Sequence, residues 1–180
     1  MRMNTATDAK PSQSRLSPRL LEKARRLGLQ LPVDLERLAI ARGCDYYERE
    51  LGSRSEPLGE VPLSNAELGV ALIVSSLPPS PREVRLAAAL FGAPDVRADE
   101  VAVLAMQENC ANVVRYIALC GQRYEPENPF WRELIARLPE ASSDFDHLPH
   151  PTRFVEMTGI DRQRVGVVTR WIRPRLPAAA

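Results

Sequence analysis

The stretch Leu63–Leu77 constrains what this chain can fold into more than any other part of its sequence. Ser64 and Glu67 have the spacing of a capping box, which marks the start of a helix. From Leu68 to Leu77 no residue is charged, and apolar side chains point in every direction around the predicted helix. A helix that is apolar on all sides must be surrounded by protein or by lipid.

The length of this apolar run decides between those two surroundings. It covers about ten residues, whereas a helix needs roughly twenty to span a bilayer. We therefore expect a central core helix with other helices packed around it.

Cap residues followed by proline divide much of the remaining chain into short helices. The pairs Ser17–Pro18, Ser80–Pro81 and Asn128–Pro129 each place a capping side chain before the first helical position, where proline costs nothing. Apolar side chains at helical spacing follow these and other starts. Helices are predicted over about residues 18–27, 33–42, 64–77, 81–91, 97–108, 111–124 and 130–138. The sequence thus predicts an all-α fold, either an irregular multi-helix bundle or a short array of helical hairpins.

Changes in composition divide the chain into four predicted parts. Residues 1–16 hold almost no apolar side chains, and we expect a disordered tail there. An N-terminal helical hairpin follows over 17–52, and a Gly/Ser/Pro-containing linker leads to the helical body at 63–138. Residues 139–180 form a Pro-rich loop and a basic C-terminal segment.

Charge is unevenly distributed although the net charge is only +1. Residues 1–30 carry seven basic and two acidic side chains, and residues 151–180 carry six basic and two acidic ones, whereas the middle is strongly acidic. Basic ends of this kind either fold onto the acidic body or bind an anionic partner. The three cysteines form no CxxC pair, and no apolar leader opens the chain, so we expect a reduced, cytoplasmic protein without a membrane segment.

The segment 153–174 has two interpretations. In the first it is a β-hairpin, in which Arg153–Gly159 pairs with a β-branched run that begins at Val165, and residues 160–164 form the turn. The β-branched residues favour this interpretation, and Gly166 disfavours a helix by about 1 kcal/mol.

In the second interpretation, residues 159–171 form a helix-turn-helix. Gly159 is then the turn glycine, and a recognition helix begins at Asp161. Arginine and glutamine side chains read guanine and adenine edges by bidentate hydrogen bonds. The candidate nucleic-acid contacts are Arg162, Gln163, Arg164 and Arg170.

A second group of candidate binding residues lies near the end of the helical body, where aromatic and arginine side chains are closely spaced. Such side chains are enriched at the energetic centres of protein interfaces. Trp131 has a second interpretation as an anchor of the core. The candidate interaction residues are Tyr124, Phe130, Trp131 and Arg132.

Reactive side chains give no catalytic or metal motif. His147 and His150 are the only histidines, and they lie beside Asp144 and Asp146 in a Pro-rich loop, a setting more typical of ordinary surface residues than of zinc ligands. Cys110 lies at a predicted helix start, where the helix dipole lowers a thiol pKa. No histidine is near it in sequence, so we expect all three cysteines to be structural and predict no metal or cofactor.

No Gly-rich phosphate loop, GxSxG elbow or HExxH motif occurs in the chain. The leading interpretation is therefore a non-enzymatic protein–protein interaction module: an adaptor, a chaperone-like partner or an assembly subunit that binds another protein. The alternative is a small DNA-binding transcriptional regulator that uses residues 159–171. A third hypothesis is an enzyme of unrecognised type centred on the His147 and His150 loop.

Overall fold

A computed structural model describes residues 18–44, 58–76, 79–140, 160–161 and 168–169. These residues contain helices and one short pair of strands. The helices are α1 (Arg19–Arg26), α2 (Val33–Ala41), α3 (Asn65–Ser75), α4 (Pro81–Phe91), α5 (Ala98–Gln107), α6 (Ala111–Tyr124) and α7 (Pro129–Arg137). The strands are β1 (Ile160–Asp161) and β2 (Val168–Thr169).

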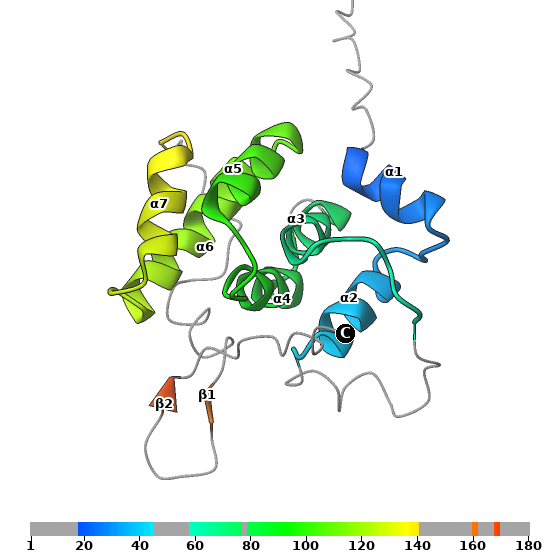
Figure 1. Cartoon of the computed structure of the whole chain (residues 1–180), viewed down its shortest axis with the longest axis horizontal. Helices are drawn as coiled ribbons and strands as arrows, with labels where there is room; N and C mark the ends of the chain where they lie inside the picture. Colours follow the sequence, from blue (N-terminus) through cyan, green and yellow to red (C-terminus); the bar gives the residue numbers. More distant parts are fainter. Residues whose placement is uncertain (1–17, 45–57, 77–78, 141–159, 162–167, 170–180) are drawn as a thin grey trace, which may run out of the picture.

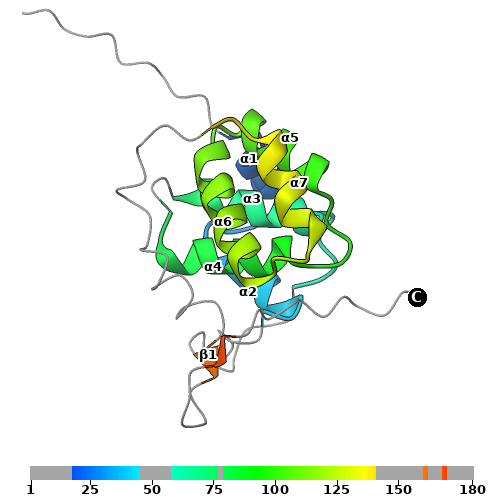
Figure 2. The same cartoon turned by 90° about the vertical axis from the view of Figure 1, so that its left-hand side faces the viewer.

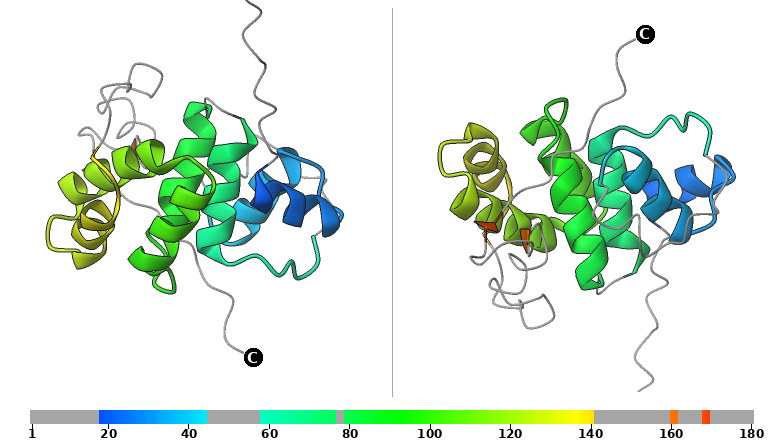
Figure 3. Two further views of the ribbon diagram at one scale, coloured as in Figure 1. Left: turned by 90° about the horizontal axis from the view of Figure 1, so that it is seen from above. Right: turned by 90° about the horizontal axis from the view of Figure 1, so that it is seen from below.

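The prediction of an all-α fold is confirmed. Figure 1 shows α3 and α4 side by side at the centre, with α1 and α2 on one side and α5, α6 and α7 on the other. The views from above and below show the same three groups in a row (Figure 3). Seen from the α5–α7 side, α6 and α7 stand in front of α3 (Figure 2). None of the described helices combines the length and the apolar character that a membrane crossing requires.

Helix α3 is the central core helix that its sequence predicts. The Ser64 hydroxyl accepts from the Glu67 amide at 3.0 Å, and the Glu67 carboxylate accepts from the Ser64 amide at 3.0 Å, which completes the capping box. The side chains of Leu68, Leu72 and Ile73 are fully buried. This burial follows because α3 packs against α1, α2, α4 and α5.

Helix α4 is joined to α3 by a buried carboxylate. Glu83 completes a second capping box with Ser80, and it also accepts from the hydroxyls of Ser75, at 3.2 Å, and Ser76. One side chain therefore caps the start of α4 and holds the end of α3 against it.

Side chains cap helix α7 at both ends. The Asn128 side chain accepts from the Phe130 amide at 3.1 Å, as the cap-then-proline pair predicts. At the other end, Arg115 of α6 donates to the carbonyls of Ile135 and Leu138 at 2.8 and 3.1 Å. The last carbonyls of a helix lack the usual amide partner four residues on. Arg115 donates to them across the α6–α7 contact, and the Leu138 amide also donates to the Ile135 carbonyl at 3.3 Å.

The C-terminal strands correct part of both interpretations of 153–174. Ile160 pairs with Thr169 and Asp161 with Val168 in antiparallel register. An antiparallel pair is what the hairpin interpretation requires, but residues 160 and 161 belong to a strand and not to the turn. Extended pairing at Asp161 and Val168 also disagrees with a helix that begins at Asp161, and β-branched side chains such as Val168 and Thr169 favour the extended form. The remaining positions of 153–174 lie outside the described residues.

The predicted division into parts remains a prediction, because the tail 1–16 and most of 139–180 lie outside the described residues. Within the described part, α1 packs chiefly on α3, and α2 packs on α3 and α4. Both N-terminal helices therefore contribute to the same core as the body.

Gly69 gives a direct test of how tightly α3 is enclosed. A Cβ at this position would lie 2.5 Å from Cε1 of Phe91, closer than the two atoms can approach. In an open helix, glycine to alanine gains about 1 kcal/mol, whereas overpacking a core costs about 1–3 kcal/mol. We expect Gly69→Ala to lower the free energy of unfolding, measured by urea denaturation.

Gly59→Ala is the matched control for this substitution, because no atom lies within 4 Å of a Cβ there. Its stability should stay within about 0.5 kcal/mol of the wild type. A Gly69→Ala protein more stable than the wild type would show that α3 is not closely packed against Phe91.

Candidate functional site

Trp131 lies in the core of the α6–α7 pair. Its side chain has 0% exposure, and its indole Nε1 donates to the Glu125 carboxylate at 2.9 Å. Phe130 meets the indole edge-on, with ring centroids 4.8 Å apart. A Cβ on Gly121 of α6 would lie 2.4 Å from the indole ring, so α6 approaches the tryptophan closely. In the chain as described, Trp131 therefore serves as an anchor of the core.

The other predicted interaction residues differ in position. Phe130 is partly buried and packs on the core, whereas Arg132 is exposed. Tyr124 is the last residue of α6, and its side chain lies outside the described part of the structure. Of the predicted residues, Arg132 alone is described as solvent-exposed, so an interface centred on these four residues stays a prediction.

The candidate nucleic-acid contacts Arg162, Gln163, Arg164 and Arg170 lie outside the described residues, as does the histidine loop. The DNA-binding alternative and the enzyme hypothesis therefore stay predictions. Among the described residues, no group of three or more histidine, cysteine, aspartate or glutamate side chains is placed to hold a metal ion.

The cysteines are buried thiols. Cys44, Cys110 and Cys120 are free of disulfides and enclosed by the core. Burial raises the pKa of the Cys110 thiol to about 12, and the nearby Glu108 carboxylate contributes. Burial likewise raises the pKa of the Cys120 thiol to about 11. At neutral pH both remain protonated, so neither is the thiolate that nucleophilic chemistry needs.

The lowered pKa that a helix N-terminus gives a thiol is not found at Cys110. Cys110 does occupy the N-cap position of α6. The dipole would favour the thiolate there, but enclosure in apolar surroundings and the neighbouring Glu108 carboxylate disfavour it more strongly.

The outward side of α5 carries apolar side chains, which the sequence analysis did not single out. From Val101 to Met106 every residue is apolar, and the half of these that faces the core is buried. Val103 and Met106, one turn apart, are nevertheless 47% and 48% exposed. We call Val103, Met106 and the exposed Gln107 the α5 outer face. The uninterrupted apolar run was the feature of the sequence that marked it.

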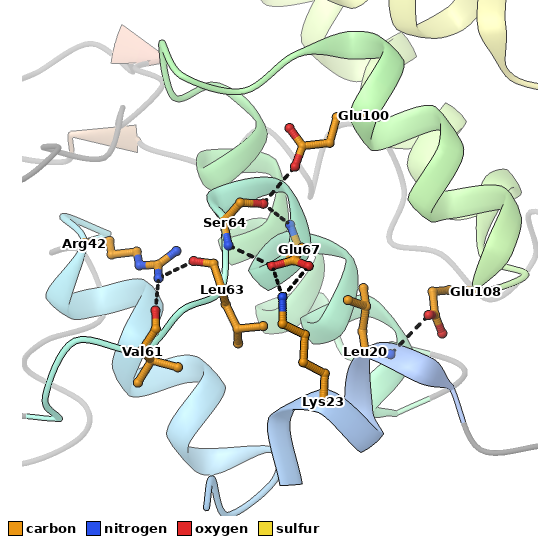
Figure 4. A network of polar contacts seen from close by, with 9 residues as sticks. All are labelled: Leu20, Lys23, Arg42, Val61, Leu63, Ser64, Glu67, Glu100 and Glu108. Atoms are coloured by element: carbon orange, nitrogen blue, oxygen red, sulfur yellow. Dashed lines mark hydrogen bonds and ion pairs between the residues drawn. The ribbon is translucent and has the colours of Figure 1, made fainter. Parts of the chain in front are cut away.

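A second candidate surface is the place where α1 rests on the body (Figure 4). Helix α1 buries Leu20, Leu21 and Ala24, and it packs on α3. The ammonium of Lys23 contacts both carboxylate oxygens of Glu67 at 2.6 and 2.7 Å. We call the apolar surface of α3 beneath α1, together with Glu67 and Glu108, the α1 site.

The start of α1 is capped by a residue that follows the end of α5. Pro18 occupies the N-cap position of α1 and makes no side-chain cap. Instead, the Glu108 carboxylate accepts from the Leu20 amide at 3.1 Å, across 88 positions of sequence. The other oxygen, Oε2, is buried and has no hydrogen-bond partner among the described residues. Sequence reasoning missed this contact because no local pattern links residues so far apart.

Helix α2 is fastened to the segment before α3 by Arg42. Its guanidinium donates to the carbonyls of Val61 and Leu63 at 3.3 and 2.6 Å (Figure 4). It also donates to the Asn65 side chain at 3.0 Å. Burial lowers the pKa of Arg42, and the charge of Asp95 opposes that shift. This arginine therefore fixes the approach to α3, and with it the position of Glu67.

No family model, curated protein or solved structure matches the chain.

Trp131→Ala tests the role of the tryptophan as a core anchor. Removing a fully buried tryptophan costs about 3–5 kcal/mol of stability, and the substitution also leaves the Glu125 carboxylate without its indole donor. We expect a loss of this size in urea denaturation. Arg132→Ala, at an exposed position on the same helix, should change stability by less than about 0.5 kcal/mol. Equal effects of the two substitutions would contradict the core assignment.

Proposed function

We propose that this protein is a non-enzymatic helical protein–protein interaction module, which acts as an adaptor, a chaperone-like partner or an assembly subunit. The observation that carries this proposal is the α5 outer face. Helix α5 has the apolar run of a core helix from Val101 to Met106, yet Val103 and Met106 are about half exposed. An apolar run of this length passes through more than one full turn of helix, so both its inward and its outward side are apolar, and apolar helix faces are expected to be covered.

The energetics favour a partner on this face. Covering apolar surface yields about 25 cal/mol for each Å² removed from water. Methionine suits such a contact because its flexible thioether adapts to different partner shapes. Leu104, which is partly buried beside these residues, extends the apolar surface toward the core.

Charged groups at the start of α5 define the edge of the proposed interface. Asp99 is about half exposed and pairs with Arg97 at 2.7 Å, and Glu100 accepts from the Ser64 hydroxyl at 2.9 Å. Polar rims around an apolar centre are the usual anatomy of protein interfaces. We therefore infer a partner that offers apolar side chains at the centre and polar or basic ones toward the start of α5.

A capture experiment with designed variants tests this function. The full chain should co-purify with a stoichiometric protein partner from cells in which it is expressed at its natural level. The double variant Val103→Asp/Met106→Asp should lose that partner, because two carboxylates on the α5 outer face cannot be buried without large cost. Captured proteins are quantified by mass spectrometry relative to the bait.

Val33→Asp is the matched control. Val33 is 51% exposed, like Val103, but lies at the start of α2, where a carboxylate is tolerated. It should retain the partner. Retention of the same partner by the double variant, or the absence of any stoichiometric partner, would contradict the proposal.

A further inference from the structure

A second binding surface lies beneath α1, and its argument does not depend on the α5 outer face. Helix α1 meets the body as an amphipathic helix meets a groove. It buries Leu20, Leu21 and Ala24 on one side, and its Lys23 pairs with the Glu67 carboxylate. The contact thus combines a short apolar stripe with one lysine aimed at a carboxylate.

Contacts within the body position the residues that α1 binds, independently of α1 itself. Glu67 completes the α3 capping box with Ser64, and the Ser64 hydroxyl also donates to Glu100 of α5 at 2.9 Å (Figure 4). Arg42 fixes the segment that leads into α3. The acceptor carboxylate is therefore positioned by α2, α3 and α5.

Helix α1, by contrast, has few features that would stabilise it as an isolated helix. It has eight residues, and its N-cap residue supplies no side-chain cap. Isolated helices of this length are not stable in water, so α1 is helical because the body binds it. Among the described helices α1 packs chiefly on α3, and Glu108 at the end of α5 caps its start. An element at the edge of the core with few packing partners opens more readily than the core beneath it.

The α1 site also has binding capacity that α1 does not use. Glu108 is buried, and its Oε1 caps the Leu20 amide, but its Oε2 has no hydrogen-bond partner among the described residues. A helix that carried a hydrogen-bond donor within reach of this oxygen would satisfy it. Leaving a buried acceptor unsatisfied costs free energy, so such a helix would bind the site better than α1 does.

We propose that the α1 site is a docking site for a basic amphipathic helix of another protein and that α1 is its autoinhibitory occupant. The partner helix presents apolar side chains at the positions of Leu20, Leu21 and Ala24 and a lysine at the position of Lys23. It replaces α1 on α3 and uses the carboxylates of Glu67 and Glu108 as its anchors. Linkage in one chain gives α1 a high effective concentration, so the partner must compete with it.

Peptide binding to the full chain tests this inference. The probe is a fluorescein-labelled synthetic peptide of residues 18–30, and the host is the full chain with Leu20→Asp/Leu21→Asp, which releases its own α1. Fluorescence anisotropy should show at least tenfold tighter binding to this host than to the wild type. Circular dichroism and a cooperative urea transition confirm that the host body is folded.

A charge-deletion cycle shows whether the peptide occupies the α1 site. Glu67→Gln in the host keeps the capping box, which glutamine also completes, but removes the charge that faces the lysine. This substitution should weaken peptide binding severalfold. The peptide with Lys23→Gln should lose a similar factor on the host that retains Glu67 and little on the host that carries Glu67→Gln. Independent, additive losses would overturn the assignment of the site.

Hydrogen exchange of the wild-type chain tests whether α1 opens separately from the body, and it does not require the released host to fold. The α1 amides should exchange through an opening that leaves α3 protected. Exchange of α1 only through global unfolding would overturn the proposal. So would a folded host that fails to bind the peptide, or one that forms dimers in its place, because the occupant of the site would then be a second copy of this chain.

Discussion

The burial of α3 on every side is the constraint on which the rest of the structure depends. From Leu68 to Val74 its side chains are apolar all round, and each direction is closed by a different neighbour. Those neighbours need an apolar stripe toward α3 and a polar one toward water. This requirement explains why short, separately capped helices surround a single central one, and why a glycine is needed where Phe91 crosses α3.

Carboxylates at helix ends connect these neighbours to one another. Glu67 caps α3 and binds Lys23 of α1, and Glu83 caps α4 and binds Ser75 of α3. Glu125 similarly accepts from Asn128 and Trp131 at the α6–α7 joint, at 2.8 and 2.9 Å. Glu67 and Glu83 satisfy the N-cap amides of their own helices and bind side chains of a neighbouring helix, whereas Glu125 binds two side chains at the start of α7. The joints between helices are therefore specified by polar contacts, whereas the core supplies most of the apolar burial.

Local patterns in the sequence were sufficient for the parts of the fold that local chemistry controls. The capping boxes at Ser64 and Ser80, the cap at Asn128 and the central burial of α3 follow from spacing alone. Tertiary contacts decide the rest. Whether Trp131 faces the core or a partner depends on the close approach of Gly121, and neither residue predicts the other. The Cys110 pKa depends on enclosure, which outweighs the helix dipole that the sequence reveals.

The two candidate surfaces likewise depend on tertiary contacts that local sequence patterns do not reveal. Six successive apolar residues in α5 were visible in the sequence, but which of them remain exposed depends on where α3 and α7 lie. The cap that Glu108 provides to α1 joins distant parts of the chain and could not be predicted from either end.

A matched pair of leucine truncations tests the central position of α3 most directly. Leu72 in α3 is fully buried, whereas Leu119 in α6 is 43% exposed. In urea denaturation of the full chain, Leu72→Ala should lower the free energy of unfolding by about 2–5 kcal/mol. Leu119→Ala should lower it by less than about 1 kcal/mol. Similar, small losses for both substitutions would contradict the account, because α3 would then not be the enclosed helix around which the others pack.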